Sequence, residues 1–217
     1  MKRNLIYVIV PVIVVTIVLF AAGLVPVPGQ GEDGAQLYER MCALCHGSLG
    51  EGYGAAGAVA LGNPKFLAVA DDAYLFENIA RGRQGTRMSV WSDTYGGPLT
   101  DDQVRQIVRY IRQWQTEPVV DISSIEVTGD PGQGMVIYVR ECASCHGDQG
   151  EGRDEAPAAP NGAPSLNHPT FLETASDGFI QFSVAKGRPG MSMPAYEGVL
   201  SAEEIGDVVA YIRAWQK

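Results

Sequence analysis

The chain has 217 residues, of which 46% are hydrophobic and 19% charged, and its formal net charge is −9. This length suits one mid-sized domain or two small ones, and the composition is that of a folded protein, not a disordered one. The acidic balance argues against nucleic acid as a partner.

The first predicted element is an uncharged, apolar run from residue 5 to residue 25. A helix of this length reaches about 31 Å, which spans the hydrocarbon core of a bilayer. Lys2 and Arg3 precede the run, so the positive-inside rule keeps the N-terminus in the cytoplasm and exports the remainder. The sequence predicts a single-pass anchor in the cytoplasmic membrane over residues 1–30, with the rest of the chain on the outer, periplasmic or extracellular, face.

A cleaved signal peptide is the alternative, because the small residues Ala21, Ala22 and Gly23 suit a cleavage site. The apolar part of a signal peptide is about 7–15 residues long, so the longer run here favours a retained anchor. Without the two positive charges of Lys2 and Arg3, the net charge of −9 becomes −11 for the exported part. Such a charge suits plain solubility or docking to a basic patch on a partner.

The next element is a short helix that carries the sequence MCALCHGSLG at residues 41–50. Cys42, Cys45 and His46 lie at positions i, i+3 and i+4 and therefore share one face of a helix. Cys-x-x-Cys-His is the attachment signature of c-type haem. In that signature the thiols bond to the two vinyl groups and the imidazole takes one axial position on the iron.

The remainder of the first half contains two further predicted helices. Residues 71–80 form a short middle helix, followed by a basic loop. The closing helix begins at Thr100, and Gln103 three residues later completes a capping box. Its apolar residues recur at helical spacing: Val104, Ile107, Val108, Ile111 and Trp114. The loop contains three arginines: Arg81, Arg83 and Arg87. They serve either to neutralise haem carboxylates or to dock a partner protein.

The second half repeats the first, with ECASCHGDQG at residues 141–150 in the place of the first motif. Four blocks recur in the same order, which indicates duplication of a whole domain. The predicted domains are residues 31–116 and 131–217, each small and all-α. Residues 117–130 match nothing in either half and contain proline and glycine, which predicts a linker. Its valine and isoleucine residues are expected to lie against a domain surface.

Zinc and a redox disulfide are the other common uses of Cys-x-x-Cys. A zinc site takes four ligands, usually from pairs about 15–20 residues apart, whereas the two motifs here are far more widely separated. His168 occurs in one half only, opposite Asn63, and is predicted to be a surface residue. A redox disulfide accompanies a βαβ pattern, which this helical sequence lacks. Haem at Cys142, Cys145 and His146, as at the first motif, is therefore the preferred interpretation.

Each half resembles a class I cytochrome c domain. The resemblance rests on the Tyr-x-x-x-Cys-x-x-Cys-His opening, on Gly-Arg-Pro-Gly-x-x-Met-Pro-x-Tyr at residues 187–196, and on the closing Tyr-Ile-Arg-x-Trp helix. It covers most of residues 32–217. It implies two covalently bound haem c groups, with His/Met ligation that raises the reduction potential.

The family takes its sixth iron ligand from a methionine after the middle helix, which implies Met88 in the first half. In the second half Met191 and Met193 compete. The repeat pairs Met88 with Met193, and Met193 precedes Pro194 as in the family pattern, so Met193 is the predicted ligand. Met191 is expected to pack against the haem. The first half departs from the pattern, because Ser89 follows its methionine.

The family also fixes the axial histidine through a backbone carbonyl, which implies Pro164 for His146 and Val59 for His46. A carbonyl does not depend on the side chain, so valine is acceptable at this place. Beyond the methionines, Trp91 and its repeat partner Tyr196 are expected near a haem edge. The aromatic residues of the first and last helices are expected to pack on each other.

With both axial positions filled by protein, no open site remains for small-molecule chemistry, so the sequence predicts an electron-transfer protein and no enzyme. The arrangement resembles membrane-anchored dihaem cytochromes c, including haem subunits of quinol-oxidising complexes and haem-copper oxidases. That resemblance implies a relay between a membrane respiratory or photosynthetic complex and an exported acceptor. The alternatives are the haem subunit of a dehydrogenase and a dihaem peroxidase.

Overall fold

The computed structural model describes residues 31–52, 54–83, 86–123, 125–155, 159–160 and 162–216. The predicted membrane anchor over residues 1–30 lies outside these residues. None of the helices in the described ranges is long and apolar enough to cross a membrane. From Asp33 onward the chain forms one unit, to which the following description applies.

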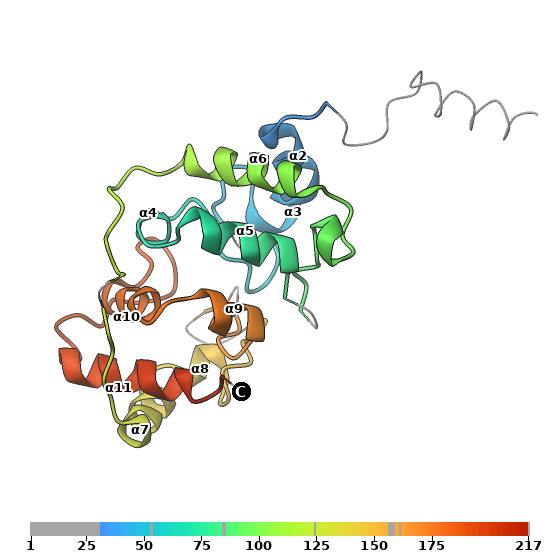
Figure 1. Cartoon of the computed structure of the whole chain (residues 1–217). Coiled ribbons are helices and arrows are strands. Elements are labelled where there is room, and N and C mark those ends of the chain that lie inside the picture. Colours follow the sequence, from blue (N-terminus) through green and yellow to red (C-terminus); the bar gives the residue numbers. More distant parts are fainter. Residues whose placement is uncertain are drawn as a thin grey trace, which may run out of the picture. The chain divides into compact units, whose positions relative to one another are not determined.

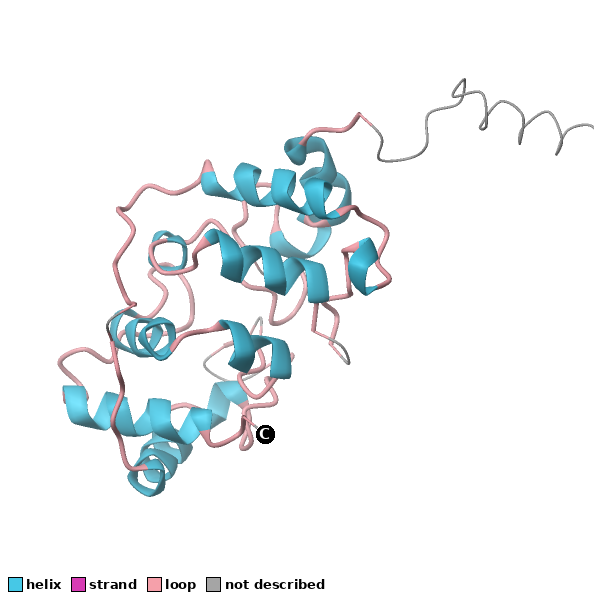
Figure 2. Cartoon of the chain, viewed as in Figure 1, coloured by secondary structure: helices cyan, strands magenta, loops and turns pink. Residues whose placement is uncertain are grey.

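The described residues consist of helices, loops and isolated β-bridges (Figure 2), which confirms the predicted all-α class. The helices of the two repeats follow one another along the chain (Figure 1). The first repeat contains α2 (Gly34–Met41), α3 (Ala43–His46), α4 (Pro64–Leu67), α5 (Asp72–Arg81), the 3-10 helix η1 (Asp93–Tyr95) and α6 (Asp101–Arg112). The second contains α7 (Pro131–Glu141), α8 (Ala143–His146), α9 (Pro169–Thr174), α10 (Asp177–Lys186) and α11 (Ala202–Arg213).

The closing helices begin at the predicted caps. The side chain of Thr100 accepts a hydrogen bond from the Gln103 N–H, and the Gln103 side chain accepts one from the Thr100 N–H. Ser201 and Glu204 form the same reciprocal pair at the start of α11. These caps satisfy backbone groups that the first helical turn leaves without partners.

Each repeat is built on the crossing of its first helix over its last. The buried ring of Tyr38 on α2 packs edge-on against Trp114, with ring centroids 5.0 Å apart, and also contacts Tyr110. Tyr138 on α7 makes the same pair of contacts, with Trp215 at 5.2 Å and with Tyr211. The predicted packing of these aromatic residues is therefore confirmed.

A glycine stands at the closest point of both crossings. A Cβ atom on Gly34 would clash with the backbone carbonyl of Gln106, and one on Gly134 would clash with that of Asp207. Glycine is required here because the helix backbones meet without room for any side chain. The crossing fixes the direction in which α2 and α7 deliver the Cys-x-x-Cys-His segments that follow them.

An arginine on each last helix joins three elements. Arg112 on α6 pairs with the Asp72 carboxylate of α5 at 2.6 Å. It also donates to the carbonyls of Leu67, the last residue of α4, and of Ala70 beyond it. The carbonyl groups at the end of a helix have no partners within it, and Arg112 supplies one for Leu67. Arg213 makes the same three contacts in the second repeat, to Leu172, Ala175 and Asp177.

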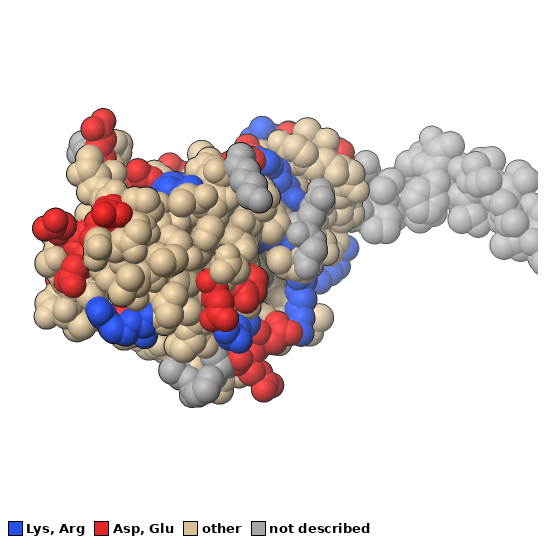
Figure 3. Space-filling model, turned by 90° about the horizontal axis from the view of Figure 1, so that it is seen from below, with Lys and Arg blue, Asp and Glu red and all other residues tan. Residues whose placement is uncertain are grey.

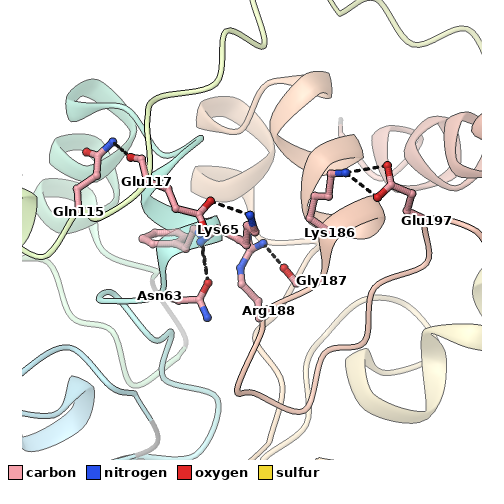
Figure 4. A network of polar contacts seen from close by, with 9 residues as sticks. Asn63, Lys65, Gln115, Glu117, Lys186, Gly187, Arg188 and Glu197 are labelled. Atoms are coloured by element: carbon pink, nitrogen blue, oxygen red, sulfur yellow. Dashed lines mark hydrogen bonds and ion pairs between the residues drawn. The ribbon is translucent and has the colours of Figure 1, made fainter.

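The linker between the repeats lies against their surfaces, as expected. Its Val120 N–H donates to the Ala68 carbonyl at 2.8 Å, and its Glu117 forms an ion pair with Lys65 at 2.7 Å (Figure 4). Further along, Ile122 and Val127 are partly buried against the core. These contacts hold both ends of the linker in place.

The buried side chains of the two repeats form one continuous cluster. At the junction, the Tyr74 ring of the first repeat stacks on Phe179 of the second, with centroids 4.6 Å apart. Phe66 meets the same phenylalanine edge-on at 6.3 Å. The two repeats are therefore held together by packed aromatic surface as well as by the linker.

Candidate functional site

Each repeat contains a crevice, and its Cys-x-x-Cys-His segment lies in the wall. In the first repeat Cys42, Cys45 and His46 line the crevice together. Cys42 caps the one-turn helix α3, and its carbonyl accepts hydrogen bonds from the N–H groups of Cys45 at 3.1 Å and His46 at 2.9 Å. The short helix thus turns two thiols and one imidazole toward the same cavity. The second repeat reproduces these distances with Cys142, Cys145 and His146.

None of the four cysteines of the two motifs forms a disulfide. Burial raises the pKa of Cys42 to about 12, and the neighbouring Cys45 adds to the effect. Burial likewise raises the pKa of Cys142 to about 12, with smaller contributions from Glu141 and Cys145. Reactive redox cysteines have the opposite property, since a low pKa produces the thiolate that attacks a disulfide. These thiols are thus unlike those of a redox disulfide.

The imidazole rings of both repeats are held by a backbone carbonyl. His46 Nδ1 lies 2.8 Å from the Val59 carbonyl oxygen, and His146 Nδ1 lies 3.0 Å from that of Pro164. A carbonyl oxygen only accepts, so Nδ1 must carry the proton and donate it. Burial lowers the pKa of both imidazoles, which favours the neutral ring. Nε2 is consequently left with a free lone pair, the state in which histidine binds a metal.

The methionine loops of the two repeats close in the same way. The Arg83 N–H donates to the Met88 carbonyl at 2.8 Å, and the Arg188 N–H donates to the Met193 carbonyl at 3.0 Å. The loop geometry therefore pairs Met88 with Met193. Met88 lines the first crevice, while Met193 and Met191 both line the second.

Two aromatic residues stand beyond the methionines. Trp91 lines the first crevice. Tyr196 lines the second, and its hydroxyl donates to the Glu141 carbonyl at 2.9 Å. Burial raises the pKa of Tyr196 to about 12, so its hydroxyl stays protonated and remains a donor at neutral pH.

The basic loop of the first repeat faces the second repeat. Arg81 forms an ion pair with Glu173 at 2.6 Å, and Arg87 forms one with Asp154 at 2.9 Å. Arg83 donates to the Ser165 carbonyl at 3.3 Å. The three side chains thus join the repeats, and they do not form a free docking patch, which was one of the two roles that the sequence left open. On the face seen in Figure 3, basic and acidic groups are interspersed.

His168 differs from its prediction as a surface residue. It is the N-cap of α9, and its Nδ1 accepts a hydrogen bond from the Thr170 N–H at 3.2 Å. The side chain is partly buried, because the cap turns it back over the helix start. Asn63, its counterpart, caps α4 in the same way. Asparagine commonly caps helices, so the alignment of His168 with Asn63 in the repeat could have predicted that His168 caps a helix.

Sequence comparison places both repeats in one family. The family model described as cytochrome C oxidase, cbb3-type, subunit III matches residues 29–111 and again residues 129–212. A cbb3-type cytochrome c oxidase subunit CcoP of Azospirillum sp. (strain B510) is 28% identical over 189 residues, which is 82% of this chain and 60% of the relative. The subunit FixP of Bradyrhizobium diazoefficiens is 27% identical, over 83% of this chain and 59% of the relative. The chain thus spans about 60% of the length of these relatives.

Two other matches widen the comparison. The cytochrome c subunit of a quinone alcohol dehydrogenase from Gluconacetobacter polyoxogenes is 30% identical over 66% of this chain and 34% of that subunit. A chain from a reducing HAO-like protein complex of Kuenenia stuttgartiensis has a TM-score of 0.50 and 22% identity, over 86% of this chain and 96% of that one, and supports the fold alone. The double match of the family model carries the assignment: the chain belongs to the family of cytochrome c oxidase, cbb3-type, subunit III.

Proposed function

We propose that the chain carries two covalently bound haem c groups and transfers single electrons as a subunit of a membrane respiratory complex, such as a terminal oxidase. One observation carries the proposal: two thiols, a neutral imidazole and a methionine line the same crevice in both repeats. Haem supplies the redox chemistry, since its iron alternates between the ferrous and ferric states. Each crevice thus contains every type of side chain that attachment and ligation of haem c require.

The residues of each crevice have separate tasks in this proposal. Cys42 and Cys45, like Cys142 and Cys145, hold the haem through thioether bonds. Nε2 of His46 and of His146 would bind the iron, and the carbonyls of Val59 and Pro164 keep each ring in the required tautomer and orientation. Met88 and Met193 would supply the second protein ligand of each iron. A haem held by both ligands would leave no open position on the iron for a small-molecule substrate.

The remaining parts of the proposal concern location. The apolar run at residues 5–25 anchors the chain in the cytoplasmic membrane, with residues 31–116 and 131–217 as haem domains on its outer face. An anchor confines the haems to the membrane surface and raises their effective concentration near membrane partners. The oxidase-subunit role is supported by the names of the CcoP and FixP relatives.

Haem attachment is tested by production of the full chain in a host with haem-maturation enzymes, followed by denaturation and intact-mass measurement. The expected product carries two haems per chain that denaturation does not release. Cys42→Ala/Cys45→Ala and Cys142→Ala/Cys145→Ala are expected to lose one covalent haem each. A wild-type chain without covalent haem contradicts the proposal.

A second candidate function is supported by the match to the cytochrome c subunit of a quinone alcohol dehydrogenase. In that case the chain accepts electrons from a dehydrogenase subunit. Purification in mild detergent from the native membrane separates the two candidates. Haem-copper oxidase subunits are expected in the purified complex, whereas a dehydrogenase subunit in their place supports the second function.

A further inference from the structure

The two crevices share walls at the junction between the repeats. The crevice with Cys142 and His146 is also lined by Phe66, Tyr74 and Arg83 of the first repeat. The crevice with Cys42 and His46 is completed in turn by residues of the second repeat, namely Asp154, Ala163, Pro164 and Ser165. Residues of the neighbouring domain therefore complete the wall of each crevice, and both crevices lie at the boundary between the domains.

The residues of this boundary obey an approximate two-fold symmetry. Arg83 of the first repeat lies over the Phe171 ring of the second, with the guanidinium carbon 5.4 Å from the ring centroid. Its repeat partner Arg188 lies over the Phe66 ring of the first repeat at 5.8 Å. The same offset in sequence relates the two arginines and the two phenylalanines. The exchange is reciprocal, because each domain provides the arginine that covers a ring of the other.

Local contacts hold both guanidinium groups in place. Arg83 donates to the Asn78 side chain at 3.4 Å, and Arg188 donates to the Ser183 hydroxyl at 2.8 Å. Arg188 also donates to the Gly187 carbonyl at 2.9 Å (Figure 4). These side chains are neutral, so they orient the two arginines without balancing their charge.

The charge of these two arginines is the unusual feature of the boundary. Among the described residues, no carboxylate lies within ion-pair distance of Arg83 or Arg188, although both are partly buried. The other cations of the same two loops all have such a partner: Arg81 has Glu173, Arg87 has Asp154 and Lys186 has Glu197.

Burial of a charge is costly unless an opposite charge lies nearby, and the contact with an aromatic ring offsets only part of that cost. Both arginines face into the second crevice, and Arg83 faces into the first as well. The anion is therefore expected inside the crevices. Haem c carries two carboxylates on one edge, and guanidinium groups bind carboxylates through charge-assisted hydrogen bonds.

We propose that Arg83 and Arg188 form a shared cationic site for the haem carboxylates at the domain boundary, which couples the two haems electrostatically. The inference rests on the proposed function, since it requires haem in both crevices. A nearby positive charge disfavours the ferric iron, which is the more positive state, and so raises the reduction potential. Because Arg83 lines both crevices, its charge acts on both haems, whereas Arg188 acts mainly on the haem of the second repeat.

The test is a redox titration of the purified full chain, with each haem followed by its absorption. Arg188→Gln is expected to lower the ferrous-to-ferric ratio of the second haem about tenfold at a fixed ambient potential, which corresponds to about 59 mV. Arg83→Gln is expected to lower that ratio for both haems. Arg188→Lys and Arg83→Lys retain the charge and are expected to recover most of the loss.

Arg105→Gln is the matched control, since Arg105 also lies over an aromatic ring, Phe76 at 5.2 Å, but lines neither crevice. Its expected effect on both potentials is small. If the glutamine variants carry two haems and their reduction potentials equal those of this control, the inference is overturned. The inference is also overturned if the lysine variants lower the potentials as much as the glutamine variants do, because the arginines would then act through packing and not through charge. Absence of haem from the wild-type chain is a different result, which overturns the proposed function itself.

Discussion

Met88 and Met193 occupy corresponding places in two loops, each closed by a hydrogen bond from the arginine five residues earlier. The competitor Met191 corresponds to Thr86, because the N–H groups of both donate to that same arginine's carbonyl, at 2.9 and 3.0 Å. Threonine is no haem ligand in this arrangement, so symmetry favours Met193. The structure thus adds a backbone argument to the one from the repeat.

The choice between the methionines predicts a spectroscopic result. Met193→Leu is expected to remove about half of the red-region absorption that methionine-sulfur ligation gives to ferric haem, since one of two sulfurs is lost. Met88→Leu is expected to remove the other half. Met191→Leu, the matched control in the same loop, is expected to keep the full band. The assignment is wrong if Met191→Leu loses the band and Met193→Leu keeps it.

The helix crossings explain why two short repeats hold their motifs so similarly. Gly34 and Gly134 bring the backbones of first and last helices together, and the motif cysteines follow within one turn of the helix end. A side chain at either glycine would push α2 or α7 outward. The displaced helix would then carry the thiols and imidazole away from the crevice.

Gly134→Ala is therefore expected to destabilise the haem-loaded chain by roughly 1–3 kcal/mol, because overpacking outweighs the gain of about 1 kcal/mol in helix propensity. The measurement is the urea midpoint, followed by far-UV circular dichroism. Gly132→Ala in the same helix is the control, since its Cβ would meet only the flexible Asp130 side chain, at 3.1 Å. Equal midpoints for the two variants would contradict the role of the crossing.

The arginine of the closing Tyr-Ile-Arg-x-Trp helix stabilises the contact between three helices of its repeat. Arg213→Ala leaves the Leu172 and Ala175 carbonyls without a donor and breaks the pair with Asp177. Loss of such charge-assisted hydrogen bonds is expected to cost roughly 2–4 kcal/mol in the free energy of unfolding. Arg105→Ala removes an exposed ion pair with Asp102 and is expected to cost less than about 1 kcal/mol. Comparable losses in the two variants would refute this account.

The elements themselves could largely be predicted from the sequence, because capping and apolar periodicity are local signals. Thr100 with Gln103 marks the start of α6, and the spacing of Cys42, Cys45 and His46 indicates their common face. The carbonyl partners of the histidines required the family pattern, since no side chain marks them. Periodicity gives no information on which loop faces another domain, so the ion pairs of Arg81 and Arg87 across the boundary were not predicted.

At the scale of the whole molecule, the two domains act as one body because aromatic residues and ion pairs cross the boundary. Phe66, Tyr74, Phe171 and Phe179 are each ordinary core residues in the sequence of their own repeat. Only the packing of the two domains brings them into one cluster. The reciprocal arginine site depends on the same packing, which is why the repeat alone did not reveal it.

The stacked pair at the centre of the boundary predicts a measurable coupling. A double-mutant cycle of Tyr74→Leu and Phe179→Leu is expected to give an interaction energy of about 0.5–1.5 kcal/mol in urea unfolding. A cycle of Tyr38→Leu and Tyr138→Leu is the control and is expected to be additive, since each of these rings packs within its own repeat. An additive result for Tyr74 and Phe179 would show that the boundary does not couple the domains.

The central claim is that both crevices serve electron transfer and that neither serves small-molecule chemistry. A reductive titration of the detergent-purified chain, followed by carbon monoxide at neutral pH, tests it most directly. The account predicts uptake of one electron per haem, two per chain, and no spectral shift with carbon monoxide, because the proposed histidine and methionine ligands would leave no position on either iron open. Rapid carbon monoxide binding to either haem would reveal an open iron and contradict the account in favour of an enzyme such as a dihaem peroxidase.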